Sequence, residues 1–210
     1  MKALSFDDIS IVPQYSNLSS RSEVNLSTNL FDYNMRLPIL SSCMDTVTGI
    51  EMQKALVAAG VLGIHHRFCN TETLLEATKY GPVAVSPSIG IDIIKQTYDG
   101  RSKPPIFCLD IAHGDSRICY DYAKEISHWG HIISANICTA DAAKRYLDIG
   151  VNTLRVGVGG GSVCSTRVVA GIGIPNITAI MDIRNACPEA TILADGGLRS
   201  SGDILKDLAC

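Results

Sequence analysis

Short apolar runs alternate with amphipathic segments along most of the chain, from residue 38 to the end. The apolar runs end in small or polar residues, which favours strands, and the segments between them carry apolar residues at helical spacing. The predicted strands are 38–43, 61–65, 83–85, 106–109, 132–135, 154–158 and 191–194. The predicted helices are 49–59, 71–80, 91–98, 116–129, 140–149, 177–187 and 202–210. This alternation indicates βα units and a parallel sheet.

Several positions predict where these elements begin and end. Thr71 is placed to cap the start of the second helix, and Gly150 is placed to end the fifth. Residues 1–37 contain Pro13 and many serines and asparagines, which predicts an irregular arm before the main fold. We therefore expect one domain over residues 1–210, with residues 1–37 as its N-terminal arm.

Polar and small side chains collect where the predicted strands end. They are Ser41, Ser42, His65, His66, Ser86, Asp110, His113, Asn136 and Asp195. A (β/α)8 barrel carries its active site at this end of its strands, and a doubly wound sheet also binds ligands there. The first strand and helix are not joined by a Gly-x-Gly-x-x-Gly loop, which disfavours the doubly wound alternative. The predicted fold class is thus α/β, a (β/α)8 TIM barrel.

The number of βα units falls short of such a barrel, which usually needs about 250 residues. The pattern supplies seven strands and ends inside the seventh helix, so the eighth βα unit is missing from this chain. We expect a C-terminally incomplete barrel, in which residues 191–194 form an unpaired edge. On this expectation the isolated chain aggregates, or its barrel is completed by another polypeptide or by C-terminal residues outside this sequence. Residues 1–210 alone should then bind nucleotide poorly and turn over slowly or not at all.

Composition narrows the class of protein. The chain has 210 residues, 46% hydrophobic and 19% charged, with a formal net charge of −3, which fits a globular protein. This balance argues against nucleic acid or an anionic membrane as the main partner. The eight cysteines are scattered from Cys43 to Cys210 without a Cys-x-x-Cys pair, so we expect a reduced, cytoplasmic location.

The stretch from Arg155 to Arg167 carries the strongest chemical signal. It reads Arg-Val-Gly-Val-Gly-Gly-Gly-Ser-Val-Cys-Ser-Thr-Arg. Glycines let a loop turn sharply and present its backbone N–H groups to an anion. Cys164, with two arginines near it in sequence, is a candidate nucleophile of lowered pKa. The residues of this stretch alone leave open the alternative of an inert buried cysteine beside a surface turn.

Several motifs in one order resemble the IMP dehydrogenase/GMP reductase family over essentially the whole chain. They are Leu-Ser-Phe-Asp-Asp at 4–8, Ser-Ser-Cys-Met-Asp-Thr-Val at 41–47, Gly-Ile-His-His at 63–66, Asp-Ile-Ala-His-Gly at 110–114, the loop 159–167 and Ala-Asp-Gly-Gly at 194–197. The resemblance implies a (β/α)8 barrel, a homo-oligomer that is usually a tetramer, and a purine nucleoside monophosphate as substrate.

The resemblance also implies a role for each matching residue. Cys164 matches the catalytic cysteine, which attacks C2 of the purine ring and forms a covalent adduct, and Thr166 matches the threonine that helps activate water or ammonia. The substrate-binding positions are Ser42 and Met44, which touch the nucleotide, Ser162, Gly196 and Gly197 at the 5′-phosphate, and Asp195 at the ribose hydroxyls.

Cofactor positions follow from the same resemblance. Asp110, Asn136 and Arg155 match positions near the nicotinamide cofactor, which is NAD or NADPH. Potassium is implied at the backbone carbonyls of Gly159, Gly161 and Cys164, with further ligands from a C-terminal segment. The family's mobile flap, and the catalytic glutamate of its reductases, would follow residue 210.

Two reactions compete on this resemblance. The short link from His66 to Val83 has no room for the CBS pair of most IMP dehydrogenases, which favours a GMP reductase that deaminates GMP to IMP with NADPH. The opposite conclusion is favoured by the amino-acid sequence at residues 167–175 and 198–203 and by His113. These positions resemble a dehydrogenase that oxidises IMP to XMP with NAD. Since some dehydrogenases lack the insert, we favour the dehydrogenase. The third alternative is a non-catalytic nucleotide-binding or assembly subunit.

Overall fold

The computed structural model describes residues 3–98, 103–161 and 164–210. Contacts within the chain divide it into two compact units. The N-terminal unit comprises residues 12–108 and 129–131, and the C-terminal unit comprises residues 1–11, 109–128 and 132–210. None of the helices in the described ranges is long and apolar enough to span a bilayer.

The N-terminal unit begins with ordered structure inside the segment that the sequence predicted to be irregular. After the short 3-10 helix η2 (Arg21–Glu23), strands β1 (Thr28–Leu30) and β2 (Tyr33–Met35) form an antiparallel hairpin. The expectation of an irregular arm is therefore wrong for residues 28–35. Leu30 and Met35 are almost fully buried, and their burial stabilises the hairpin. The sequence did not predict these strands because neither contains a long apolar run.

The rest of the N-terminal unit alternates strands and helices as predicted. The elements are β3 (Leu40–Ser41), α1 (Ile50–Ala58), β4 (Leu62–Gly63), α2 (Thr71–Ala77), β5 (Val83–Val85), α3 (Ile91–Tyr98) and β6 (Ile106–Leu109). Strands β3 and β4 are parallel, and β5 lies next to β6. Helix α2 is capped by Asn70, whose side chain accepts from the Thr73 N–H at 2.8 Å, so the prediction of Thr71 as the cap is wrong by one residue.

The C-terminal unit continues the same pattern. Its strands are β7 (His131–Ile133), β8 (Thr153–Val156) and β9 (Thr191–Ala194), and its helices are α4 (Arg117–Ile126), α5 (Ala140–Asp148), α6 (Thr166–Val169), α7 (Asn176–Ala186) and α8 (Ser201–Leu208). The three strands are parallel neighbours in chain order, with four residue pairs in register from Thr153↔Thr191 to Val156↔Ala194. Gly150 follows α5 at a φ of 83°, as its place in the sequence predicts.

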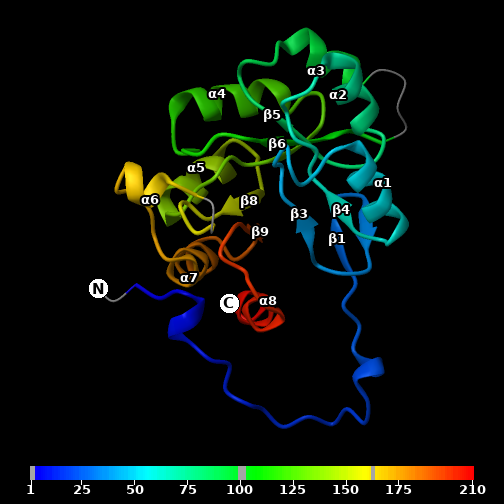
Figure 1. Cartoon of the computed structure of the whole chain (residues 1–210). Helices are drawn as coiled ribbons and strands as arrows, with labels where there is room; N and C mark the ends of the chain where they lie inside the picture. The colour runs from blue at the N-terminus through cyan, green and yellow to red at the C-terminus, as the bar shows by residue number, and fades with distance from the viewer. Residues whose placement is uncertain (1–2, 99–102, 162–163) are drawn as a thin grey trace. The chain divides into compact units, whose positions relative to one another are not determined.

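The first residues of the chain pack against the last two long helices of this unit. The 3-10 helix η1 (Phe6–Asp8) lies beside α8, and Figure 1 shows the blue N-terminal segment next to the orange and red helices. The Leu4 N–H donates to the Thr178 hydroxyl at 2.7 Å, and the Lys206 ammonium donates to the Phe6 carbonyl at 2.7 Å. The chain's N-terminus thereby forms one wall of the site described next.

The seven predicted strands correspond to β3 through β9, and each predicted helix has a counterpart in the structure. The sequence pattern did not predict α6, a single turn that begins two residues after the candidate nucleophile. A four-residue helix is too short to show periodicity. The carboxyl ends of β8 and β9 bring the glycine loop and the Asp195 turn together within the C-terminal unit.

Candidate functional site

Cys164 lies on the loop after β8, two residues before α6 begins. It is exposed, whereas the other seven cysteines, all of them described, are buried or half-buried. Its sulfur lies 3.3 Å from the Thr166 hydroxyl. Hydrogen bonds from that hydroxyl, and then from the backbone N–H groups of Thr166 and Gly159, lower the pKa of the Cys164 thiol because they stabilise the thiolate. The thiol is therefore not the buried cysteine of the alternative interpretation.

The two arginines of the loop have other partners. The Arg155 guanidinium binds the Asp195 carboxylate, with Nη2 and Oδ2 at 3.0 Å. Arg167 donates to the Ile174 carbonyl at 2.8 Å, and its stem lies where a side chain on Gly159 or Gly173 would stand. The sequence predicted that these arginines would activate Cys164, but the hydrogen bonds that lower its pKa come from Thr166 and Gly159.

A first prediction follows for the thiol. Replacing Thr166 by valine should raise the pKa of Cys164, because the hydroxyl is the largest cause of its lowering. Alkylation by iodoacetamide requires the thiolate, so its midpoint should move to higher pH and its rate below the midpoint should fall several-fold. Peptide mass spectrometry of Cys164 across a pH series measures this. The matched control is Thr71→Val, at an exposed threonine of α2 in the other unit. If the midpoint of alkylation does not move in Thr166→Val, the Thr166 hydroxyl is not the cause of the lowered pKa.

Asp195, directly after β9, is the centre of a polar cluster. Its Oδ2 accepts from the Asn136 amide at 2.7 Å and from Arg155 Nε at 3.1 Å. Arg155 also faces Asp110, with Nη1 and Oδ1 at 3.7 Å. These side chains come from the ends of four successive strands, and the Arg155 side chain is only 11% exposed. In the described part of the chain no hydrogen bond reaches the other carboxylate oxygen, Oδ1, which leaves an acceptor for a ligand.

The two glycines after Asp195 bring its turn against the cysteine loop. Gly196 and Gly197 have φ values of 81° and 79°, which favour glycine. A side chain on Gly196 would stand 2.7 Å from the Gly161 nitrogen, and one on Gly197 would stand 3.0 Å from the Gly160 carbonyl oxygen. Only glycines permit this approach, so the thiol loop and the carboxylate turn form one contiguous surface.

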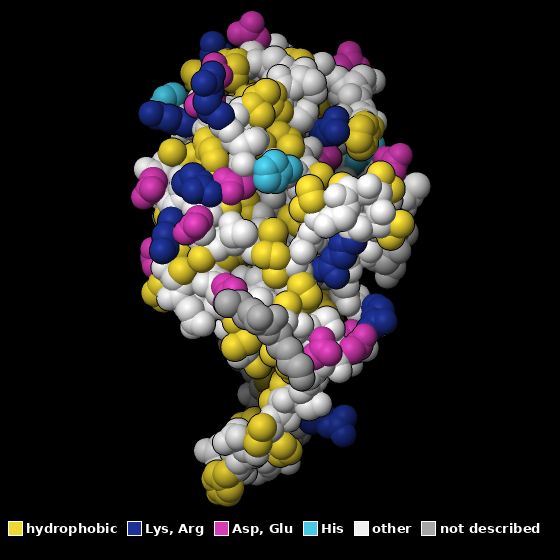
Figure 2. Space-filling view, turned by 90° about the vertical axis from the view of Figure 1, so that its left-hand side faces the viewer, with side chains coloured by type: hydrophobic (Ala, Val, Ile, Leu, Met, Phe, Trp, Pro, Cys, Tyr) yellow, Lys and Arg dark blue, Asp and Glu magenta, His cyan; other side chains and the backbone are white. Residues whose placement is uncertain are grey.

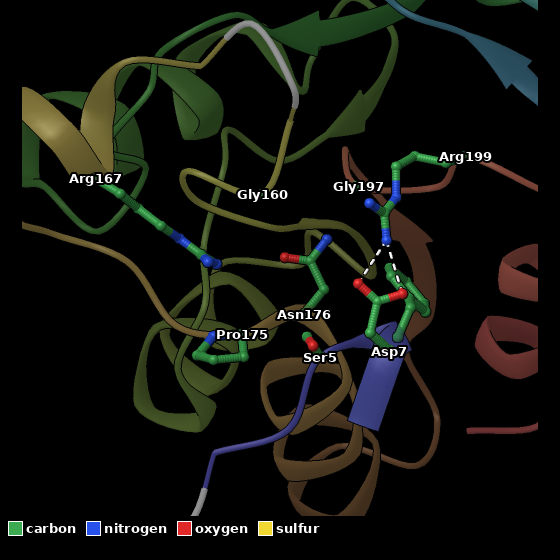
Figure 3. Close-up of a pocket in the computed structure, with 9 residues that line it drawn as sticks. Ser5, Asp7, Gly160, Arg167, Pro175, Asn176, Gly197 and Arg199 are labelled. Carbon is green, nitrogen blue, oxygen red and sulfur yellow. Dashed lines mark hydrogen bonds and ion pairs between the residues drawn. The ribbon is translucent and has the colours of Figure 1, made fainter. Parts of the chain in front are cut away.

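A hollow of about 190 Å³ lies beneath this surface, entirely within the C-terminal unit. Figure 3 shows it between η1, the glycine loop and the start of α7, with the Arg199–Asp7 ion pair at one end. The residues that line it are Ser5, Phe6, Asp7, Gly160, Arg167, Pro175, Asn176, Gly197 and Arg199. Several of these, including Asn176, carried no prediction. The Pro-Asn pair before an apolar helical segment was the only sequence signal available.

The remaining predicted site residues are Ser42, Met44, Ser162 and those whose carbonyls were predicted to bind potassium. Ser42, which is half-buried, and Met44, which is 38% exposed, follow β3 in the N-terminal unit. Ser162 lies outside the described residues. The Gly161 carbonyl, one of the three predicted for potassium, already accepts from the Cys164 N–H at 3.1 Å. That hydrogen bond leaves the oxygen a second lone pair, so potassium at Gly159, Gly161 and Cys164 stays a prediction. Among the described residues no cluster of three His, Cys, Asp or Glu suits another metal.

Comparison with known proteins places this geometry in a family. The family model described as IMP dehydrogenase / GMP reductase domain matches residues 3–81 and 101–210. The chain is 32% identical to the inosine-5′-monophosphate dehydrogenase of Borreliella burgdorferi and covers 67% of that protein. It is also 32% identical to the GMP reductase of Vibrio vulnificus and covers 64% of it. These matches include 99% and 97% of the present chain, which spans about two thirds of each relative's length.

Solved structures agree. The crystal structure of inosine 5′-monophosphate dehydrogenase from Legionella pneumophila has a TM-score of 0.87 at 33% identity. The similarity covers 99% of this chain and 66% of that chain. It confirms the predicted α/β class, with the present residues forming part of a (β/α)8 barrel.

Proposed function

The chain belongs to the IMP dehydrogenase/GMP reductase family, and from this premise we propose that it acts on a purine nucleoside monophosphate through a covalent bond to Cys164. The observation that supports the proposal most is the exposed thiol, with its pKa lowered by Thr166, on a loop that touches the Asp195 turn. A nucleophile beside a carboxylate with a free acceptor oxygen suits a substrate that carries both an electrophilic ring and a ribose.

The proposed roles follow from the contacts. The Cys164 thiolate forms an S–C2 bond to the purine as C2 loses either a hydride, which a bound cofactor would accept, or, in the reductase, its amino group as ammonia. Water (dehydrogenase) or a hydride from the cofactor (reductase) would then replace the sulfur at C2 and release the thiolate. Thr166, hydrogen-bonded to the sulfur, is placed to help move a proton of the water or ammonia that reacts at this carbon. Asp195 presents its Oδ1 to the ribose hydroxyls while Arg155 and Asn136 hold its Oδ2. The backbone N–H groups of Gly196 and Gly197 are proposed to face the phosphate. In this proposal Arg155 and Asn136 orient the ribose of the substrate by holding Asp195. This role adds to the one predicted for them near the cofactor.

The cofactor belongs to the same proposal. A nicotinamide cofactor, when bound, would accept a hydride from C2 or supply one to it. The Asp110 carboxylate, 22% exposed at the end of β6, is of the right chemistry to accept ribose hydroxyls of such a molecule. The Asn136 amide donates to Asp195 and to the Gly157 carbonyl, and Arg155 faces both Asp195 and Asp110. The residues present therefore fit the cofactor chiefly through Asp110.

Between the two reactions of the family, we propose NAD-dependent oxidation of IMP to XMP. The amino-acid sequence of residues 167–175, which resembles that of the dehydrogenases, supports this reaction. GMP reductase is the second candidate, and one observation favours it. The alignment with the Vibrio vulnificus GMP reductase runs over 222 positions, close to the length of this chain, whereas those with the dehydrogenases of Borreliella burgdorferi and Cryptosporidium parvum run over 270 and 260. The reductase thus aligns with fewer inserted residues.

Turnover measurements separate the alternatives. We expect the protein with a completed barrel to reduce NAD in the presence of IMP and to show no oxidation of NADPH with GMP. The opposite pattern would establish the reductase, and nucleotide binding without either reaction would support the non-catalytic subunit.

Three further parts of the prediction rest on the resemblance or on composition. A homotetramer and a cytoplasmic location remain predictions, as does potassium, which enters no step above. Nucleic acid is not proposed as a partner. Basic and acidic side chains are interspersed on the face that Figure 2 shows, rather than gathered in the basic stripe that tracks a phosphate backbone.

A further inference from the structure

A buried amide lies at the junction of the two loops of the site. Asn176, the first residue of α7, is only 4% exposed. Its Nδ2 donates to the carbonyl of Asp195 at 3.2 Å and to that of Gly196 at 2.7 Å. One side chain thereby binds two consecutive carbonyls of the Asp195 turn and fixes that turn on the rigid end of a long helix.

The same amide is pressed against the cysteine loop. A side chain on Gly160 would stand 2.5 Å from Asn176 Oδ1 and 2.9 Å from its Nδ2. A side chain on Gly157, at the start of that loop, would stand 3.5 Å from Nδ2. In Figure 3 the amide lies between Gly160 and Gly197, with its nitrogen on the side of Gly197 and its oxygen on the opposite side. The amide therefore acts as a spacer between the two loops.

The arrangement has an energetic cost. Among the described residues, Oδ1 of Asn176 has no hydrogen-bond partner, although it is buried. An unpaired buried acceptor is unfavourable, and proteins contain few of them. Turning the amide over would not help, because it would set the oxygen against two carbonyl oxygens. The orientation is thus dictated by the two donated bonds, and the structure tolerates an unpaired oxygen to keep them.

From this geometry we infer that Asn176 is a positioning residue: it sets the separation between the Cys164 loop and the Asp195 turn. The inference rests on the proposed function, because those two loops carry the proposed nucleophile and the proposed ribose acceptor. A nucleotide held by Asp195 reaches the sulfur at attacking distance only when the loops are correctly spaced. In this inference Asn176 acts through the two loops that it contacts, not through the reacting atoms.

The chain offers a matched control in the N-terminal unit. Gln53, fully buried on α1, donates through Nε2 to the carbonyls of Gly63 at 3.0 Å and Pro82 at 2.9 Å. Its Oε1 also has no partner among the described residues. The two amides thus make the same kind of contact, but Gln53 holds backbone that carries none of the proposed catalytic groups.

The test compares two reactions of Cys164 in each variant. One is covalent capture by 6-chloro-IMP, which requires the nucleotide to be aligned with the sulfur, and the other is alkylation by iodoacetamide, which does not. In Asn176→Asp the ratio of the capture rate to the alkylation rate should fall at least about tenfold, because an acceptor replaces the donor to two carbonyls. Asn176→Ala should lower the ratio too, which covers failure of the aspartate variant to fold.

The outcomes distinguish this inference from the proposed function. Gln53→Glu should lower the melting temperature and leave the ratio within about twofold, as expected of a purely structural amide. An unchanged ratio in folded Asn176 variants, or an equal fall in Gln53→Glu, would overturn the positioning role while leaving Cys164 as the nucleophile. No capture of the unmodified protein would refute the proposed function itself, and the inference with it.

Discussion

Replacing Cys164 by alanine should abolish turnover in whichever of the two reactions the unmodified protein catalyses, a loss of roughly a thousandfold or more. The thiol supplies the covalent route, and no other exposed cysteine of the chain can replace it, since the other seven are buried or half-buried. Reversible binding of the nucleotide should change less than about threefold, because the thiol contributes to bond formation rather than to recognition.

The control for this prediction is Cys69→Ala, at a half-buried cysteine of the N-terminal unit whose pKa is raised by burial. It should retain the activity of the unmodified protein. Steady-state assays and isothermal titration with IMP measure the two quantities. Turnover that survives the loss of Cys164 would show that the reaction does not pass through this thiol.

Replacing Asp195 by alanine should weaken nucleotide binding at least about tenfold. A carboxylate that accepts ribose hydroxyls makes charge-assisted hydrogen bonds, each worth roughly 1.5–3 kcal/mol, and each 1.4 kcal/mol is about a tenfold change in affinity. The loss should be larger than the hydroxyls alone suggest, because Arg155, 11% exposed, would also lose its ion pair with Asp195. Isothermal titration with IMP gives the affinity.

Two controls separate binding from folding in this experiment. Asp182→Ala removes an exposed carboxylate from α7 and should leave the affinity unchanged. Asp195→Asn keeps the shape and one acceptor oxygen, so we expect it to bind more tightly than Asp195→Ala and more weakly than the unmodified protein. An Asp195→Ala protein that melts as a folded domain and binds IMP normally would remove Asp195 from the substrate site.

Much of this architecture could be predicted from the sequence because its elements depend on local pattern. Strands such as 83–85 and 106–109 are short apolar runs between turn residues, and the structure has β5 and β6 at those positions. The Cys164 loop was recognisable because three adjacent glycines and a thiol are rare in one stretch. Periodicity and local chemistry together therefore indicated both the βα order and the candidate nucleophile.

The rest depended on contacts between distant parts of the chain. Arg155 is close to Cys164 in sequence. In the structure, however, its partner is Asp195, which lies 40 residues further along the chain in the turn after β9. For Asn176 the Pro-Asn pair indicates only the start of a helix, because the role of this side chain arises where two loops meet at the start of α7. The hairpin of residues 28–35 likewise depends on burial of Leu30 and Met35, which no short-range pattern reveals.

The most direct test of the central proposal is to incubate the protein with 6-chloro-IMP, digest it and map the modified residue by mass spectrometry. We expect one label per chain, on Cys164, and protection when excess IMP is present. Labelling of another cysteine while Cys164 stays free, or labelling that IMP does not prevent, would contradict a nucleotide-directed nucleophile at this position.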